Sequence, residues 1–261
     1  MLCHVLTLEF VYTMIGILSF LTQITVSFAD ASSQSLLQRV DANLALQKDF
    51  VVSSQITMTV LRGKREKSYS FSMKRKHDST AIEFLAPPRD KGTKLLKNDN
   101  SIWMYFPSIE QSQRISGHMV RQGFMGGAVS YEDMMRFSSF EERYTILSSE
   151  KSQYQGVSCI SMTLEGKKED MSYPKRNICV EPNSTVIVHD QMFSSDGTLM
   201  KELNAHDIQK YQSTDLTMYY PKNVTIVNLL EASLSTHLLY EEMEIKPLTE
   251  TSIFTLRWLE Q

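Results

Sequence analysis

The sequence has no excess of basic residues. Lysine and arginine together number 27 against 30 aspartates and glutamates, which gives a formal net charge of −3 and a pI near 6.1. Proteins that bind nucleic acid neutralise its phosphates with clustered lysines and arginines, and this sequence contains no aromatic-plus-basic ribonucleoprotein motif. Nucleic acid is therefore not an expected partner. With 42% hydrophobic and 22% charged residues, the chain can instead bury the core of a globular protein.

The sequence also lacks the motifs of common enzymes and metal sites. It contains no G-x-S-x-G nucleophile motif, no H-E-x-x-H and no C-x-x-C. The adjacent carboxylates at 132–133 and 141–142 could supply an acid and a base, but such pairs are more typical of a charged surface turn. The histidines beyond the N-terminal segment are scattered without ligand or catalytic partners: His77, His118, His189, His206 and His237. We therefore expect no enzyme, no metal and no cofactor.

Cysteine is scarce, with three residues in the chain. Cys3 precedes the apolar N-terminal stretch and cannot serve as a lipid-modified cysteine after it. Cys159 and Cys179 lie twenty residues apart in two strand-like stretches joined by a polar segment. If these strands are neighbours in an oxidising compartment, the two cysteines are candidates for a cross-strand disulfide. Two small buried apolar residues are the alternative, and the sequence does not separate the two.

Charged residues are absent from positions 11 to 29, VYTMIGILSFLTQITVSFA. This stretch ends with Ser27 and Ala29, small residues at the positions expected before a signal-peptidase site. We interpret residues 1–29 as a signal peptide, which predicts export to the periplasm and a single mature domain over residues 30–261. An uncleaved anchor in the inner membrane is the alternative, because the stretch approaches the length of a bilayer span. Polar residues within it favour cleavage.

After this stretch the hydrophobic period predicts one helix followed by many strands. Apolar residues between 35 and 47 recur near the helical period, so we expect an amphipathic helix there. The period then changes to two, in VVSSQITMTV and SYSFSMKRK, with a hairpin tip at Gly63 between them. Roughly a dozen short strands with turn signals follow one another without a linker. We expect one mainly β, antiparallel domain with few helices.

The stretch GFMGGAVSYEDMMRF, residues 123 to 137, is rich in glycine but contains no lysine, which excludes a phosphate-binding loop. Ser130 and Asp133 stand three residues apart, which predicts a capping box at the start of a short helix. Gly123, Gly126 and Gly127 permit backbone angles that other residues resist, so they are candidate hinges of a mobile connection. A static surface crossover is the alternative, and the local signals favour it.

Two residue distributions are uneven. Residues 62 to 76 contain seven lysines or arginines against one glutamate, whereas residues 231 to 261 contain six glutamates against two basic residues. One end of the protein could therefore face an anionic surface or an acidic partner, or the charges could simply prevent edge aggregation of a solvated hairpin. Thirteen methionines follow residue 29, and such adaptable side chains suit a pocket for acyl chains as well as ordinary core filling.

Three segments resemble LolA-type periplasmic lipoprotein carriers and their bacterial relatives, the outer membrane lipoprotein-sorting proteins. NSIWMYFPSIEQSQRIS, residues 100 to 116, is similar to the family's W-x-Y-x-P-x-x-E-Q strand-turn-strand. FMGG and SYEDM, residues 124 to 134, resemble a Phe-Met-Gly stretch that leads into a Tyr-Glu-Asp-Leu-like element, and PPRDKGTKLL also fits. The Pro-x-x-Phe-Arg-Trp strand of the carrier proper is absent, and KRKHDSTAIEFLAPP stands in its place.

The resemblance implies a half-open antiparallel β-barrel with a helical lid, whose apolar concave side binds lipoprotein acyl chains or lipid. It implies a monomeric carrier that moves these chains toward the outer membrane between a membrane protein donor and an acceptor, without a cofactor. A lipid-sensing regulatory module of the same fold, or a structural envelope protein, are the alternatives. On this reading the cavity and lid residues are Ile56, Met58, Val60, Tyr69, Phe71, Met73, Trp103, Tyr105, Phe124, Met125, Met134 and Met135.

Overall fold

The structure is a computed structural model that describes residues 31–261 apart from 46–47, 78, 99–100, 136–138 and 232. The predicted signal peptide, residues 1–29, lies outside the described residues. In the described part of the chain, no helix has both the length and the apolar character needed to span a bilayer.

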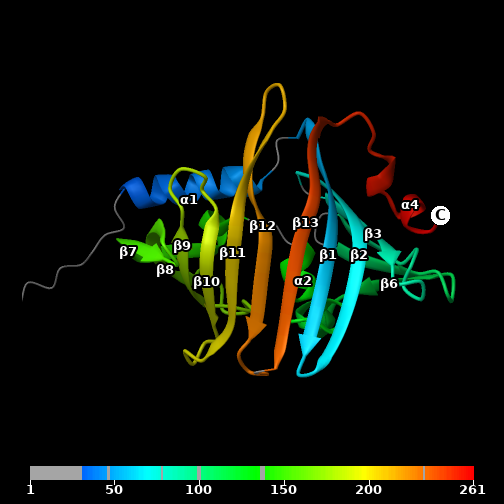
Figure 1. Cartoon of the computed structure of the whole chain (residues 1–261), viewed down its shortest axis with the longest axis horizontal. Helices are drawn as coiled ribbons and strands as arrows, with labels where there is room; N and C mark the ends of the chain where they lie inside the picture. The colour runs from blue at the N-terminus through cyan, green and yellow to red at the C-terminus, as the bar shows by residue number, and fades with distance from the viewer. Residues whose placement is uncertain (1–30, 46–47, 78, 99–100, 136–138, 232) are drawn as a thin grey trace, which may run out of the picture.

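Within the described residues, thirteen strands form one antiparallel sheet that does not close (Figure 1). Each strand pairs with its neighbours in sequence, except that β1 also pairs with β13 and leaves β6 and β7 as the two edges. This confirms the predicted mainly β architecture with an open antiparallel sheet. The strands are β1 (Phe50–Arg62), β2 (Arg65–Lys76), β3 (Ser79–Ala86), β4 (Lys94–Asn98), β5 (Ser101–Phe106), β6 (Gln111–Ile115), β7 (Tyr144–Tyr154), β8 (Val157–Gly166), β9 (Lys175–Val180), β10 (Ile187–Phe193), β11 (Leu199–Gln212), β12 (Thr217–Asn228) and β13 (Leu234–Pro247).

The helices of the described residues are short except for the first. The predicted amphipathic helix begins four residues earlier than expected, and the end predicted for it falls at 46–47, outside the described residues. The helical elements are α1 (Ala31–Leu44), η1 (Gly117–Arg121), η2 (Phe124–Gly126), α2 (Tyr131–Met135), α3 (Phe140–Arg143), η3 (Ser252–Phe254) and α4 (Leu256–Leu259).

The first hairpin shows why these residues form strands. Buried and less buried positions alternate along β1 and along the second half of β2, as expected when successive side chains point to opposite faces of a sheet. The turn at Gly63, which has φ of 58°, joins the two strands where the sequence predicts the hairpin tip. The alternation places Ile56 and Met58 on the same face as Phe71, and this is the concave face of the sheet.

Different segments cover the two faces of the sheet. α2 and the loop before it pack against the concave face of β1, β2 and β3, and α2 lies inside the curve of the sheet behind β13 in Figure 1. α1 covers the same face at the other end, where Leu37 and Val40 pack against β7, β8 and β9. The C-terminal elements η3 and α4 pack through Phe254 and Leu259 on the opposite, outer face of β3 and β4. The sheet is therefore a curved layer with a helical cover inside the curve.

A disulfide joins Cys159 on β8 to Cys179 on β9, with 5.6 Å between the two Cα atoms. The strands are neighbours in the sheet. Alternate residues of β8 such as Met162 pack under α1, so the cysteines lie on the other face, in a cluster with Val188. The disulfide thus links β8 and β9 on the outer face of the sheet, opposite the face that α1 covers.

The basic segment from residue 62 to 76 does not form one continuous surface. Its first half is the exposed tip of the β1–β2 hairpin, residues 62 to 68. Lys74 and Lys76 lie at the far end of β2, and Arg75 is buried on the concave face, with its guanidinium 5.9 Å from the ring centre of Tyr220. The alternation of faces along β2 and the length of this strand therefore separate basic residues that are close together in the sequence.

Candidate functional site

A hollow of about 230 Å³ lies on the concave face, next to the packed core rather than within it. Strands β10 to β13 form its floor, and α1 and α2 border it from above. Its apolar wall includes Val40 and Leu44 of α1, Met134 of α2, and Leu203, Ala205, Val224, Ile226 and Leu238 of the sheet. The hollow is open to one side and is smaller than the roughly 300–1,000 Å³ typical of small-molecule sites.

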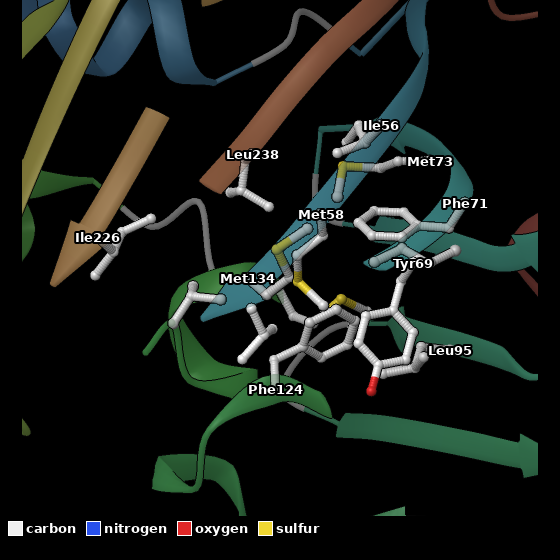
Figure 2. Packing of buried hydrophobic residues seen from close by; sticks show 14 of the residues in the cluster. Ile56, Met58, Tyr69, Phe71, Met73, Leu95, Phe124, Met134, Ile226 and Leu238 are labelled. Carbon is white, nitrogen blue, oxygen red and sulfur yellow. The ribbon is translucent and has the colours of Figure 1, made fainter. Parts of the chain in front are cut away.

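The predicted cavity residues largely fill the concave face themselves (Figure 2). Phe124 points from its loop toward Phe71, with 6.1 Å between the ring centres, and toward Phe84 at 5.9 Å. Met125 packs at the margin of this cluster, and only two of the predicted residues also border the hollow, Met73 and Met134. Nine of them are buried in this one core cluster: Ile56, Met58, Val60, Tyr69, Phe71, Met73, Phe124, Met134 and Met135.

Trp103 and Tyr105 do not lie with these residues. Both belong to the outer-face cluster, where they pack around Phe254 and Leu259 of the C-terminal segment. The placement in the cavity is therefore wrong for these two side chains. Their strand, β5, alternates as predicted, but Ile102 and Met104 are the residues that face the core.

The loop from Gly123 to Gly127 is held closely against the sheet. The amide of Phe124 donates to the carbonyl of Val129 at 2.7 Å, and the amide of Ala128 donates to the hydroxyl of Thr236 on β13 at 2.8 Å. A Cβ atom at Gly123 would stand 2.1 Å from the carbonyl oxygen of Gly127. A Cβ atom at Gly127 would stand 2.6 Å from Oγ1 of Thr236, so both positions need glycine because of close approach. An alanine at either position would disturb the fold as well as any motion.

α2 begins with the capping box that the sequence predicts. The amide of Asp133 donates to the hydroxyl of Ser130 at 3.0 Å, and the amide of Ser130 donates to the carboxylate of Asp133 at 3.1 Å. The same carboxylate also accepts hydrogen bonds from the hydroxyl of Tyr173 at 2.9 Å and from Nζ of Lys201 at 3.2 Å. Asp133 therefore caps its own helix and fastens that helix to β11.

Further charged groups line the α2 side of the hollow. Glu132 accepts a hydrogen bond from Ser172 at 2.7 Å and lies 4.0 Å from Arg143. Asp190 on β10 forms a buried ion pair with Arg176 on β9. The hollow thus has an apolar floor and one border of paired charges. Sequence reasoning missed Tyr173, Arg176, Asp190 and Lys201, because their partners are distant in sequence and no local spacing marks them.

The carboxylate of Asp133 is tuned by this setting. Burial would raise its pKa, but the charge of Lys201 and the hydrogen bonds that the carboxylate accepts together hold that pKa below its usual value. Burial raises the pKa of the Tyr173 hydroxyl, and the neighbouring carboxylate adds to this increase. Near neutral pH, the tyrosine therefore acts as a hydrogen-bond donor to an ionised Asp133.

We predict that the Asp133→Asn substitution lowers the free energy of unfolding by about 1–3 kcal/mol at pH 7, because it removes a charged hydrogen-bond acceptor of several buried donors. The folded-state pKa is lowered, so the contribution of Asp133 is present above the unfolded pKa of about 3.9 and is lost as the pH falls through the folded value. Urea unfolding at neutral and acidic pH should therefore show the two proteins converging in acid. The exposed Asp215→Asn is the control. An Asp133→Asn deficit that stays constant with pH would contradict the assignment.

Among the described residues, no group of three or more His, Cys, Asp or Glu side chains could hold a metal ion. His189 lies 2.7 Å from a carboxylate oxygen of Glu202, and His237 lies 3.0 Å from the hydroxyl of Thr225. Neither histidine lines the hollow. The chemistry that the hollow offers is apolar contact beside paired charges.

Comparison with known proteins places this fold. A family model described as "Uncharacterized protein" matches residues 76–261. No curated protein matches the sequence.

Solved structures match over nearly their whole length. A DUF1329 family protein from Desulfovibrio piger has a TM-score of 0.79 at 19% identity, covering 89% of this chain and 99% of that one. A domain from Vibrio parahaemolyticus described as an outer membrane lipoprotein-sorting protein has a TM-score of 0.75 at 17% identity, covering 87% of this chain and 97% of that one. A LolA superfamily protein from Nitrosomonas europaea has a TM-score of 0.67 at 18% identity, covering 86% and 98%. The chain therefore has the open LolA-like fold.

Proposed function

This chain belongs to the family whose model matches residues 76–261, and we propose that it is a carrier that binds lipoprotein acyl chains or lipid in its hollow and moves them toward the outer membrane. The fold it shares with proteins described as LolA superfamily and lipoprotein-sorting members supports this proposal. The observation that carries it is the hollow itself, which lies between an apolar sheet floor and helices that cover it.

Hydrocarbon binding needs little polar recognition. Each methylene group removed from water contributes about 0.8 kcal/mol, so six buried methylenes would contribute about 5 kcal/mol. The floor formed by Leu203, Ile226 and Leu238 offers such contact. The opposite border carries Asp133 and Asp190, whose ion pairs would be costly to cover with hydrocarbon. We therefore propose that the bound acyl chain lies along β11 to β13 rather than against α2.

The present hollow is too small for a complete acyl chain, so binding requires the cover to move. α1 is one candidate for the part that moves. It is held by Asn43, which bonds the backbone of Tyr219 at 2.8 and 3.0 Å, by Ser33, whose hydroxyl lies 2.7 Å from that of Ser149 on β7, and by Asp41, which accepts from the amide of Phe140 at 2.7 Å. Movement of α1 must therefore break these hydrogen bonds. The loop with Gly123, Gly126 and Gly127 is the other candidate, as the sequence suggests. Its hinge role stays a prediction, and the close packing of Phe124 opposes free motion.

The remaining features of the proposal follow from this function. We propose that residues 1–29 direct export to the periplasm and are removed, and that residues 30–261 act as one monomeric domain. The disulfide at Cys159 and Cys179 is compatible with such an oxidising compartment. We propose no catalysis, and a membrane protein donor or acceptor as the partner in transfer.

The proposal is tested by native mass spectrometry of protein purified from the cell envelope, together with displacement of a fluorescent fatty acid. We expect co-purified lipid or lipoprotein, and a bound probe that added lipid displaces. Delivery of bound lipoprotein to acceptor vesicles separates a carrier from a protein that only senses lipid. If the purified protein carries no lipid and the probe gives no saturable signal, the carrier function is wrong.

A further inference from the structure

Two turns lie side by side at one end of the sheet. The tip of the β1–β2 hairpin and the β12–β13 turn both lie at the lower end of the sheet in Figure 1. The amide of Gly63 donates to the carbonyl of Ser233 at 2.9 Å, and Arg62 pairs with Glu231 at 3.3 Å. We name this end the basic tip, defined by residues 62–67 and by Leu229 and Leu230.

The basic tip presents two adjacent leucines to solvent. Leu229 is 39% exposed and Leu230 is 62% exposed. The value for Leu230 is the highest among the exposed large hydrophobic side chains of the described residues. Their backbone is well fixed. The amide of Leu229 donates to the carbonyl of Met200 at 2.8 Å, and the side chain of Asn228 accepts from the amide of Leu230 at 3.0 Å. The fold therefore holds these apolar side chains outward in an ordered turn.

Cations surround the leucines. Lys64, Arg65 and Lys67 are exposed on the hairpin tip, and the acidic residues of the two turns are Glu66 and Glu231. Because Glu231 already pairs with Arg62, the tip has a net positive charge. The far half of β13 has exposed glutamates at 241, 242 and 244. Lys74 and Lys246 lie near these glutamates, so that end of the sheet carries mixed charge, whereas the basic tip carries an excess of positive charge.

We propose that the basic tip docks on the surface of an anionic lipid bilayer, with Leu229 and Leu230 at the boundary of the acyl chains and the cations against lipid phosphates. Neighbouring apolar and basic side chains are the combination that binds an anionic membrane interface. Leu229 and Leu230 project from an ordered turn, and a bilayer can admit two such leucines directly.

The position of the basic tip relative to the hollow supports the choice of a lipid surface. Leu203 and Ile226 line the hollow. Leu203 is three residues from Met200, and Ile226 is three residues from Leu229, which is about 10 Å at the rise of a β-strand. Docking would therefore bring the apolar floor close to the bilayer. The proposal depends only on surface residues, so it can fail while lipid binding in the hollow holds, and the reverse.

The test uses the protein as recovered from cells and measures its co-flotation with vesicles. One set is phosphatidylcholine alone and the other is phosphatidylcholine mixed with phosphatidylglycerol. Variant one is Leu229→Ser with Leu230→Ser, and its matched control is Ile109→Ser with Leu85→Ser, which removes exposed apolar side chains elsewhere. Variant two replaces Lys64, Arg65 and Lys67 by alanine, and its control replaces the exposed Lys151, Lys168 and Lys175.

We expect binding to the anionic vesicles that weakens about 100-fold in the lysine and arginine variant, since each basic residue near such a surface contributes about fivefold. The leucine variant should lose about tenfold or more. Binding should also fall between about 0.1 M and about 1 M salt. Equal losses in variants and controls, equal binding to both vesicle sets, or no binding at all would each overturn the proposal. Probe binding in the hollow should be unchanged in all four proteins.

Discussion

Replacing Ala205 by phenylalanine should weaken acyl-chain binding about 100-fold or more while the protein stays folded. Ala205 lies on β11 with 5% of its surface exposed, and it lines the hollow. A benzyl group there would occupy the space of about four methylenes, each contributing about 0.8 kcal/mol, and about 3 kcal/mol corresponds to more than two decades of affinity. The measurement is titration of a fluorescent fatty acid into each protein.

The neighbouring residue provides a matched control. His206 follows Ala205 in the same strand, is exposed and points to the other face of the sheet. His206→Phe adds an aromatic ring to β11 but leaves the hollow open, so its affinity for the probe should equal that of the wild type. Thermal unfolding of both variants should stay near the wild-type midpoint, because the new ring at position 205 fills a void instead of a packed core. A folded Ala205→Phe protein with normal affinity would show that lipid binds elsewhere.

The fold could be predicted from the sequence because most of its information is local. Val52, Ile56 and Met58 alternate with less buried residues, and this period of two is enough to identify a half-buried strand. The hairpin at Gly63 and the capping box of Ser130 and Asp133 each depend on residues within a few positions of one another. Such patterns predict the structure correctly because they depend on contacts between residues that are close in sequence.

The hollow could not be predicted, because it is the space left over when distant segments pack. The sequence marks Phe71 and Phe124 as apolar but does not tell that they meet and fill one half of the concave face. The residues that line the hollow, such as Leu203 and Ala205, have no local signature of a site. The position of Trp103 is hard to predict for a related reason. Alternation fixes that Trp103 faces away from Met104, but it does not show which face of the sheet the C-terminal segment covers.

The partners of the charged border are equally distant. Asp133 and Lys201 are 68 residues apart, and the packing of α2 against the sheet brings them together. The split of the basic segment between a hairpin tip and the far end of β2 has the same origin, because a strand of twelve residues extends about 40 Å. The sequence therefore predicts which charges are present, and the topology decides which of them meet.

Replacing Phe124 by alanine should lower the free energy of unfolding by about 3–5 kcal/mol, the cost of removing a fully buried phenylalanine. The side chain has no exposed surface, and its ring contacts Phe71, Phe84 and Tyr131 with 5.3–6.1 Å between ring centres. Urea unfolding measures the loss. Met125→Ala is the control in the same loop, because Met125 is only partly buried at the margin of the cluster and its removal should cost less.

The size of this loss also decides how the glycine loop acts. A loop that swings freely as a gate would leave the core often, so deleting its anchor could cost little, since the residue would contribute only while docked. A loss of several kcal/mol instead means that Phe124 is a permanent part of the core. In that case swinging of the loop at Gly123, Gly126 and Gly127 must break these core contacts and is a costly way to open the hollow. Movement of α1, whose buried residues include no aromatic side chain, is then the favoured route. If Phe124→Ala lowers the free energy of unfolding by less than about 1 kcal/mol, the loop remains the candidate for the part that opens the hollow.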